Sequence, residues 1–164
     1  MTFREHLEQA ALALIYGLIM WLRSIFWRIS RPKLVGVRAL IVRDRVVLLI
    51  RHRYGRQPWG LPGGGVERNE SLAEAVRREA REESGVQVEI GHLLGMYDRF
   101  KDGVSNYVGV FVCTPLNEPN PPRSLEIAEA RFFLFDELPQ GIDDGSRRRI
   151  AEYLRGERGL STMW

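Results

Sequence analysis

The chain has 164 residues, 45% of them hydrophobic, which is enough for one domain core and a short extension. Its single cysteine, Cys113, excludes an intrachain disulfide, and His6, His52 and His92 lack the spacing of a zinc site. The net charge of +3 lies within residues 1–34, so the neutral remainder does not argue for nucleic-acid binding.

The N-terminal segment combines an apolar run with basic residues. Residues 10–22 are uncharged and mostly apolar, which predicts an apolar helix. At about 1.5 Å per residue this run covers roughly 20 Å, less than the roughly 30 Å hydrocarbon core of a membrane. Arg23, Arg28, Arg31 and Lys33 follow it. The segment is therefore short for a membrane span but suited to a membrane surface.

Two interpretations of this extension stay open. Residues 7–33 bind a membrane surface, or they pack as a helix on the following domain or on a second subunit of a homo-oligomer. A cleaved signal peptide is disfavoured because Glu5 and Glu8 accompany the first arginine and no small-residue cleavage site follows. We expect a cytoplasmic protein, attached in the first case to the cytoplasmic face of a membrane.

Pro32 marks the predicted boundary between the extension, residues 1–31, and a domain over residues 32–158, with a tail at 159–164. In that domain, β-rich runs at 35–42 and 46–51 predict a hairpin. Further strands are predicted at 87–94, 107–113 and 130–135, a proline-rich loop at 115–122, and a helix at 146–155. Strands on both sides of a helix, with another helix at the end, predict an α/β fold with a mixed sheet between helices.

The most informative helix is predicted at residues 72–84. Ser71 and Glu74 have the spacing of a capping box, and Gly85 stands where a left-handed C-terminal cap belongs. Glu79 and the pair Glu82-Glu83 are related by three and four residues, so their carboxylates share one helix face.

Like charges at this spacing repel each other, and a hard divalent cation such as Mg²⁺ would relieve that repulsion. The alternative is an exposed, charge-rich helix in which Arg78 pairs with Glu82. A glycine-rich run at residues 59–65 precedes the helix, and such a loop lets backbone groups approach a phosphate closely. The combination favours a phosphate site beside a metal ion.

Residues 64–86 resemble the signature box of the Nudix hydrolases. Gly64 is followed by Glu70 after five residues, by Arg78-Glu79 after seven more, and then by Glu82-Glu83, Gly85 and Val86. One departure is Ala80, where the family usually has a larger aliphatic residue. The resemblance extends more weakly from about residue 35 to residue 139, and it implies an α/β/α sandwich.

The resemblance also implies roles for individual residues. Glu79, Glu82 and Glu83 would bind Mg²⁺ or Mn²⁺, together with the backbone carbonyl of Gly63. Glu70 and Arg78 would brace the loop and helix, and Gly64 and Gly85 would have structural roles. Relatives often carry another catalytic or metal-binding glutamate near Glu126.

The implied reaction is hydrolysis of a phosphoanhydride bond in a nucleoside diphosphate linked to another moiety. Glu79 and Glu126 are the candidates for the general base, and Glu126 is preferred over Glu129 by its distance from the following strand. Arg51 and Arg53 leave a strand toward the glycine-rich loop, where they contact substrate phosphate or serve as surface charges.

The particular substrate does not follow from the sequence. The absence of proline between Pro62 and Pro115 argues against ADP-ribose by resemblance, and a nucleoside triphosphate or a nucleotide-linked lipid or sugar stays open. A catalytically idle Nudix-fold module that binds a nucleotide or a partner is the alternative function. An enzyme acting on RNA ends would use Arg147, Arg148 and Arg149, which fit the solvated face of a terminal helix better.

Overall fold

The structure, a computed structural model of the chain, describes residues 33–53, 59–101, 104–120 and 126–164. The helix expected over residues 10–22 lies outside the described residues. The chain divides into two compact units, one of Val35–Arg99 with Asn106–Trp164, and one of Met1–Leu34 with Phe100–Ser105. All residues of the candidate site that are described below belong to the first unit. Within the described ranges, no helix is both long and apolar enough to cross a membrane.

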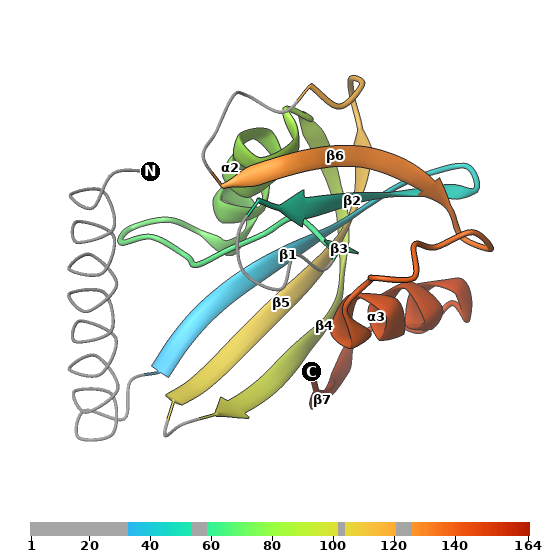
Figure 1. Cartoon of the computed structure of the whole chain (residues 1–164). Coiled ribbons are helices and arrows are strands. Elements are labelled where there is room, and N and C mark those ends of the chain that lie inside the picture. The colour runs from blue at the N-terminus through green and yellow to red at the C-terminus, as the bar shows by residue number, and fades with distance from the viewer. Residues whose placement is uncertain (1–32, 54–58, 102–103, 121–125) are drawn as a thin grey trace, which may run out of the picture. The chain divides into compact units, whose positions relative to one another are not determined.

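The core of the fold is a seven-stranded mixed sheet (Figure 1). Its main path runs β3-β2-β1-β5-β4-β7, and β6 pairs with β2. The pairs β1 with β2 and β2 with β6 are antiparallel, whereas β4 with β7 is parallel. The strands are β1 (Lys33–Arg43), β2 (Val46–His52), β3 (Trp59–Gly60), β4 (Val88–Lys101), β5 (Val104–Pro115), β6 (Ile127–Leu134) and β7 (Leu160–Met163).

The two described helices cover opposite faces of this sheet. On β1, Val37 and Ile41 belong to one buried cluster, which also contains Val76 of α2 (Leu72–Ser84). The intervening Leu40 belongs to another cluster, which contains Ile150 of α3 (Asp144–Leu154). Because successive side chains of a strand point to opposite faces, α2 and α3 lie on the two sides of the sheet. The predicted α/β/α arrangement with a mixed sheet is confirmed.

Helix α2 has the ends that its sequence predicts. The Ser71 hydroxyl accepts from the Glu74 amide at 3.2 Å, and Glu74 Oε2 accepts from the Ser71 amide at 2.8 Å. Gly85 closes the helix in the left-handed conformation with φ of 71°. For α3 the prediction began two residues late, because the cap is Asp143, whose carboxylate accepts from the Ser146 amide at 2.9 Å.

The C-terminal residues 159–164, expected as a tail, contain β7. This strand pairs with β4 from Gly95 to Asp98. The prediction ended the β4 strand at residue 94, but the pairing continues beyond Gly95. At Gly95 a Cβ would lie 2.6 Å from the main-chain oxygen of Leu160, so glycine permits the close approach. Parallel pairing of this kind joins distant segments and leaves no local pattern.

The glycine-rich run is hydrogen-bonded along β1 without forming a further strand there. The amides of Val37 and Ala39 donate to the oxygens of Gly64 and Pro62 at 2.9 and 2.8 Å. At Gly63, where φ is 146°, a Cβ would overlap the main-chain oxygen of Val37. Only glycine fits this approach without strain. The loop is therefore held at a fixed distance from the sheet.

We expect Gly85→Ala to destabilise the protein more than Gly156→Ala. Both glycines have positive φ, 71° and 75°, and this conformation costs roughly 1–2 kcal/mol for other residues. At Gly156 nothing lies within 4 Å of an added Cβ, whereas at Gly85 the Cβ would overlap Asn120 backbone. Urea unfolding of both variants measures the difference. Equal losses in the free energy of unfolding would contradict the steric part of this account.

Candidate functional site

Two glutamates of α2 reach the glycine-rich loop. Glu83 Oε2 accepts from the Gly63 amide at 2.7 Å. A Cβ at Gly64 would overlap the carboxylate of Glu79. The absence of a side chain at Gly64 thus lets the Glu79 carboxylate approach the backbone of the loop.

Arg78 joins the loop to the helix. Its Nε and Nη2 donate to the two carboxylate oxygens of Glu70 at 2.7 and 2.9 Å, which is a bidentate pair. Nη2 also donates to the Gly65 carbonyl at 2.9 Å, and Nη1 donates to Glu79 at 2.8 Å. The contact with Glu82 is longer, at 3.3 Å. The structure thus brings together Arg78, Glu70 and Glu79.

The charges of neighbouring carboxylates affect the pKa of Glu83. Burial is the main cause that raises the pKa of Glu83 to about 7. The Gly63 amide and the charge of Arg38 oppose this shift in pKa, and the charges of Glu79 and Glu126 add to it. Glu126, which stands just before β6, is therefore close enough to act electrostatically on Glu83.

The described residues do not contain a ready-made group of three metal-ligating side chains. Glu79 and Glu82 turn to Arg78, and Glu83 turns to the Gly63 amide. Glu82 is also 53% exposed, and it shares Arg78 Nη1 with Glu79. The assignment of the metal ligands stays a prediction.

Arg51 and Arg53, the candidate phosphate ligands, make contacts with β6. Arg51 Nη2 donates to Glu129 at 3.1 Å, and its guanidinium lies 5.3 Å from the centre of the Trp59 ring. Arg53 Nη2 donates to the Ile127 carbonyl at 3.3 Å. The Arg53 amide donates to the Glu126 carbonyl at 2.7 Å. Both arginines thus line the start of β6, and their role toward phosphate stays a prediction.

A pocket of about 700 Å³ opens on the α3 side of the sheet, and sequence reasoning missed it. Arg38 connects it to the loop, because its guanidinium donates to the carbonyls of Leu61, at 3.2 Å, and Gly63. The pocket residues come from separate elements, so no spacing in the sequence groups them. The other polar and aromatic side chains that line it are His52, Arg99, Asn106, Asp143, Asp144, Arg148 and Trp164.

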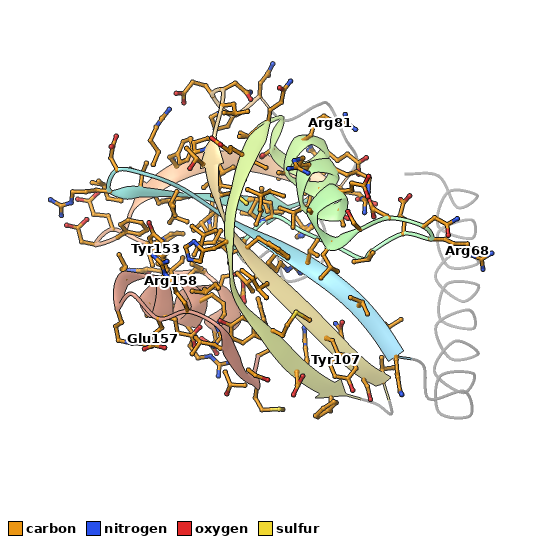
Figure 2. All side chains as sticks on the ribbon, turned by 180° about the vertical axis from the view of Figure 1, so that it is seen from behind. Arg68, Arg81, Tyr107, Tyr153, Glu157 and Arg158 are labelled. Atoms are coloured by element: carbon orange, nitrogen blue, oxygen red, sulfur yellow. The ribbon has the colours of Figure 1, made fainter. Side chains whose placement is uncertain are left out.

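A second hollow, of about 660 Å³, lies beside α2. Arg77, Arg78 and Arg81 line it, but Glu79, Glu82 and Glu83 do not. Figure 2 shows Arg81 on α2 and Arg68 in the loop before it, both at the surface. Of these two hollows, the pocket beside Arg38 is the one that Gly60 and Leu61 of the glycine-rich run line.

The mixed sheet between two helices, with α2 turned to a glycine-rich loop, agrees with the comparisons to known proteins. A model of the NUDIX domain matches residues 32–154. The chain therefore belongs to the Nudix family.

Its relatives include proteins of bacteria and archaea. The ADP-ribose pyrophosphatase of Methanocaldococcus jannaschii is 29% identical over 136 residues, which cover 81% of this chain and 80% of that protein. YjhB of Bacillus subtilis is 33% identical over 112 residues, covering 66% of this chain. That match covers 53% of YjhB, so the chain spans about half the length of this relative.

The solved structures show the same fold. The MutT NUDIX hydrolase of Burkholderia pseudomallei is 31% identical, with a TM-score of 0.67. The match covers 74% of this chain and 98% of that structure.

We expect the ion pair of Arg78 with Glu70 to make the free energy of unfolding depend on pH in the acidic range. The hydrogen bond from Arg78 is the main cause that lowers the pKa of Glu70 from 4.5 to about 2. A carboxyl group whose pKa is lower in the folded state stabilises the fold at every pH above its unfolded pKa. This contribution is lost as the pH falls through the pKa of the folded state. The difference in free energy of unfolding between wild type and Glu70→Gln should therefore shrink as pH falls from about 5 to about 2.

Urea unfolding across this pH range measures that difference. Glu67→Gln is the matched control, because Glu67 is 70% exposed and lies 3.9 Å from Arg78. A difference for Glu70→Gln that stays constant with pH would show that the pair does not stabilise the folded state.

Proposed function

We propose that the protein is a divalent-metal-dependent hydrolase that cleaves a phosphoanhydride bond in a nucleoside diphosphate linked to another moiety. The observation that carries this proposal is the approach of Glu79 and Glu83 to the Gly63-Gly64 backbone, with the charge of Glu126 nearby. The pocket beside Arg38 adds room for the group attached to the diphosphate. The matching relatives also support this proposal, since one of them is an ADP-ribose pyrophosphatase.

The residues present fit Mg²⁺ or Mn²⁺. Carboxylate and carbonyl oxygens are the ligands that these hard cations prefer. Burial and neighbouring negative charge raise the pKa of Glu83 to about 7, which a bound cation would counteract. Glu79, Glu82 and Glu83 would hold the ion, together with the Gly63 carbonyl. When bound, the ion offsets phosphate charge and makes a coordinated water more acidic.

The remaining steps are assigned to the chain's own residues. Arg78 orients Glu79 and fixes the loop through the Gly65 carbonyl. Glu79 or Glu126 accepts the proton of the attacking water. Glu129 is less suited to this role, because it already pairs with Arg51 at 3.1 Å and contacts Arg131 at 3.5 Å.

Several nucleotide-derived small molecules stay candidates for the substrate. The relative from Methanocaldococcus jannaschii supports ADP-ribose, against the argument drawn from the spacing of prolines. The alternative function is an idle module that binds a nucleotide or a partner. Assaying nucleoside diphosphate derivatives for Mg²⁺-dependent turnover separates the two, because the idle module would bind without releasing product.

We expect Glu82→Gln and Glu83→Gln each to lower turnover by about 10²-fold or more, because each removes a charged ligand from the proposed ion. Glutamine at position 83 keeps an oxygen for the Gly63 amide and removes a buried charge, so that variant should stay folded. Turnover with Mg²⁺ and thermal unfolding measure both expectations. Glu89→Gln, an exposed glutamate on β4, is the control. Near-normal turnover of either ligand variant would reject the metal-site assignment.

A second proposal concerns residues 7–33, whose apolar and basic sequence favours attachment to a membrane surface. Deleting residues 1–31 should abolish flotation with anionic lipid vesicles and leave turnover of soluble substrates largely unchanged. Salt should weaken flotation of the full chain, since each basic residue near the surface contributes about 1 kcal/mol. If the full chain does not float and the deletion changes oligomer size, the segment instead packs on a second subunit.

A further inference from the structure

The segment from Leu160 to Trp164 lies beyond residues 32–154, the range that the family model matches. Its residues up to Met163 form β7, which pairs in parallel with β4 from Gly95 to Asp98. This pairing brings Trp164 to the wall of the pocket on the α3 side of the sheet. The chain therefore builds part of that wall from residues outside the matched domain.

Trp164 is held in place by two elements, β4 and α3. Its amide donates to the Asp98 carbonyl at 2.9 Å, and its main-chain oxygen accepts from Arg148 Nη2 at 2.8 Å. Its ring meets Tyr97 edge to face, with 6.0 Å between ring centres. Its indole also packs on Gly145, where any Cβ would overlap the ring. Contacts with β4 and α3 thus fix both the backbone and the ring.

A buried polar network stabilises the same arrangement. Arg149, expected on a solvated face, is only 2% exposed because it pairs with Glu152 at 2.7 Å. Glu152 also accepts from the Tyr97 hydroxyl at 2.8 Å. The Arg149 guanidinium lies 3.8 Å from the centre of the Tyr97 ring and donates to the Met163 carbonyl at 3.4 Å. A buried charge is costly unless it is paired, so this network favours one position of β7 over detached ones. Figure 2 shows Tyr153, Glu157 and Arg158 around the end of α3, where the chain turns toward β7.

The pocket wall around Trp164 has a defined chemistry. Asp143 and Asp144 line it at the start of α3, and Arg99 and Arg148 line it as well. Asp143 uses Oδ1 as the helix cap. Its Oδ2 faces Gly60, where an added Cβ would lie only 2.8 Å away. An aromatic ring beside carboxylates suits a flat group with N–H donors, such as a nucleobase.

We propose that Trp164 is a substrate-binding residue whose indole stacks against the nucleobase of the substrate. β7 and the network of Arg149, Glu152 and Tyr97 hold the indole in the pocket. This inference rests on the proposed function, in that the substrate contains a nucleoside. The diphosphate then extends past Arg38 toward the glycine-rich loop, which Arg38 contacts through the Gly63 carbonyl.

The first test uses the unaltered sequence labelled with fluorotryptophan. The chain has four tryptophans, and Trp164→Phe identifies the fluorine resonance of Trp164. Adenosine diphosphate, without a metal ion, should shift this resonance, and inorganic pyrophosphate should not. Binding of adenosine diphosphate with no shift at Trp164, or an equal shift with pyrophosphate, would overturn the proposal.

The second test separates binding from turnover. Trp164→Ala should raise KM for the best nucleotide substrate about tenfold or more, as the loss of a base-aromatic stack typically does, and change kcat little. Trp164→Phe should restore much of the lost affinity, because it keeps an aromatic ring. Met163→Ala is the control, since Met163 is 53% exposed and does not line the pocket.

The two readouts distinguish this inference from the proposed function. If no substrate is hydrolysed but adenosine diphosphate still shifts Trp164, the nucleobase site stands and the hydrolase proposal fails. If hydrolysis is found and Trp164→Ala keeps a normal KM, the hydrolase proposal stands and the role of Trp164 fails. A fall in kcat alone, with KM unchanged, would show that Trp164 supports the fold and not the substrate.

Discussion

The candidate site depends on the hydrogen bonds and ion pairs that the Arg78 guanidinium makes. It binds Glu70 through two nitrogens, and it also reaches the Gly65 carbonyl and Glu79. The loop before α2 and the helix itself are thereby fixed relative to each other. This matters because the loop contains glycines, which would otherwise leave its backbone with many conformations. The ordered loop can then present amides and carbonyls at a constant distance from the carboxylates.

The sheet divides the site into two parts with different chemistry. On the α2 side, Glu79 and Glu83 approach the glycine-rich loop. On the α3 side lies the pocket with Trp164. Arg38 belongs to both parts, since it lines the pocket and donates to the Gly63 carbonyl, and its charge acts on Glu83. Changes at Arg38 should therefore affect both the proposed ion site and the pocket.

The sequence predicted best those structural features that depend on residues close together in the chain. Helix α2 begins and ends as expected, because Ser71, Glu74 and Gly85 mark its ends within a few residues of each other. Arg78 and Glu70, which the resemblance expected to brace the loop and helix, form a bidentate pair. Strand β7 and the pocket were missed, because they depend on residues far apart in the chain that only the folded sheet brings together. Trp164 carries no signal of its own, since its place is set by pairing with β4.

Two groups of charged residues differ in how well their positive and negative charges are matched. The first group is structural, and the second is the candidate site. Arg149 and Glu152 form a buried pair in which the acid is also bound by Tyr97, so the charges are matched inside the fold. Around Arg78, a single guanidinium serves Glu70, Glu79 and Glu82, while Glu83 and Glu126 add further negative charge nearby. Arg38 offsets part of this charge at Glu83. The remaining carboxylates are those that the proposed cation would join, whereas the first group is already matched.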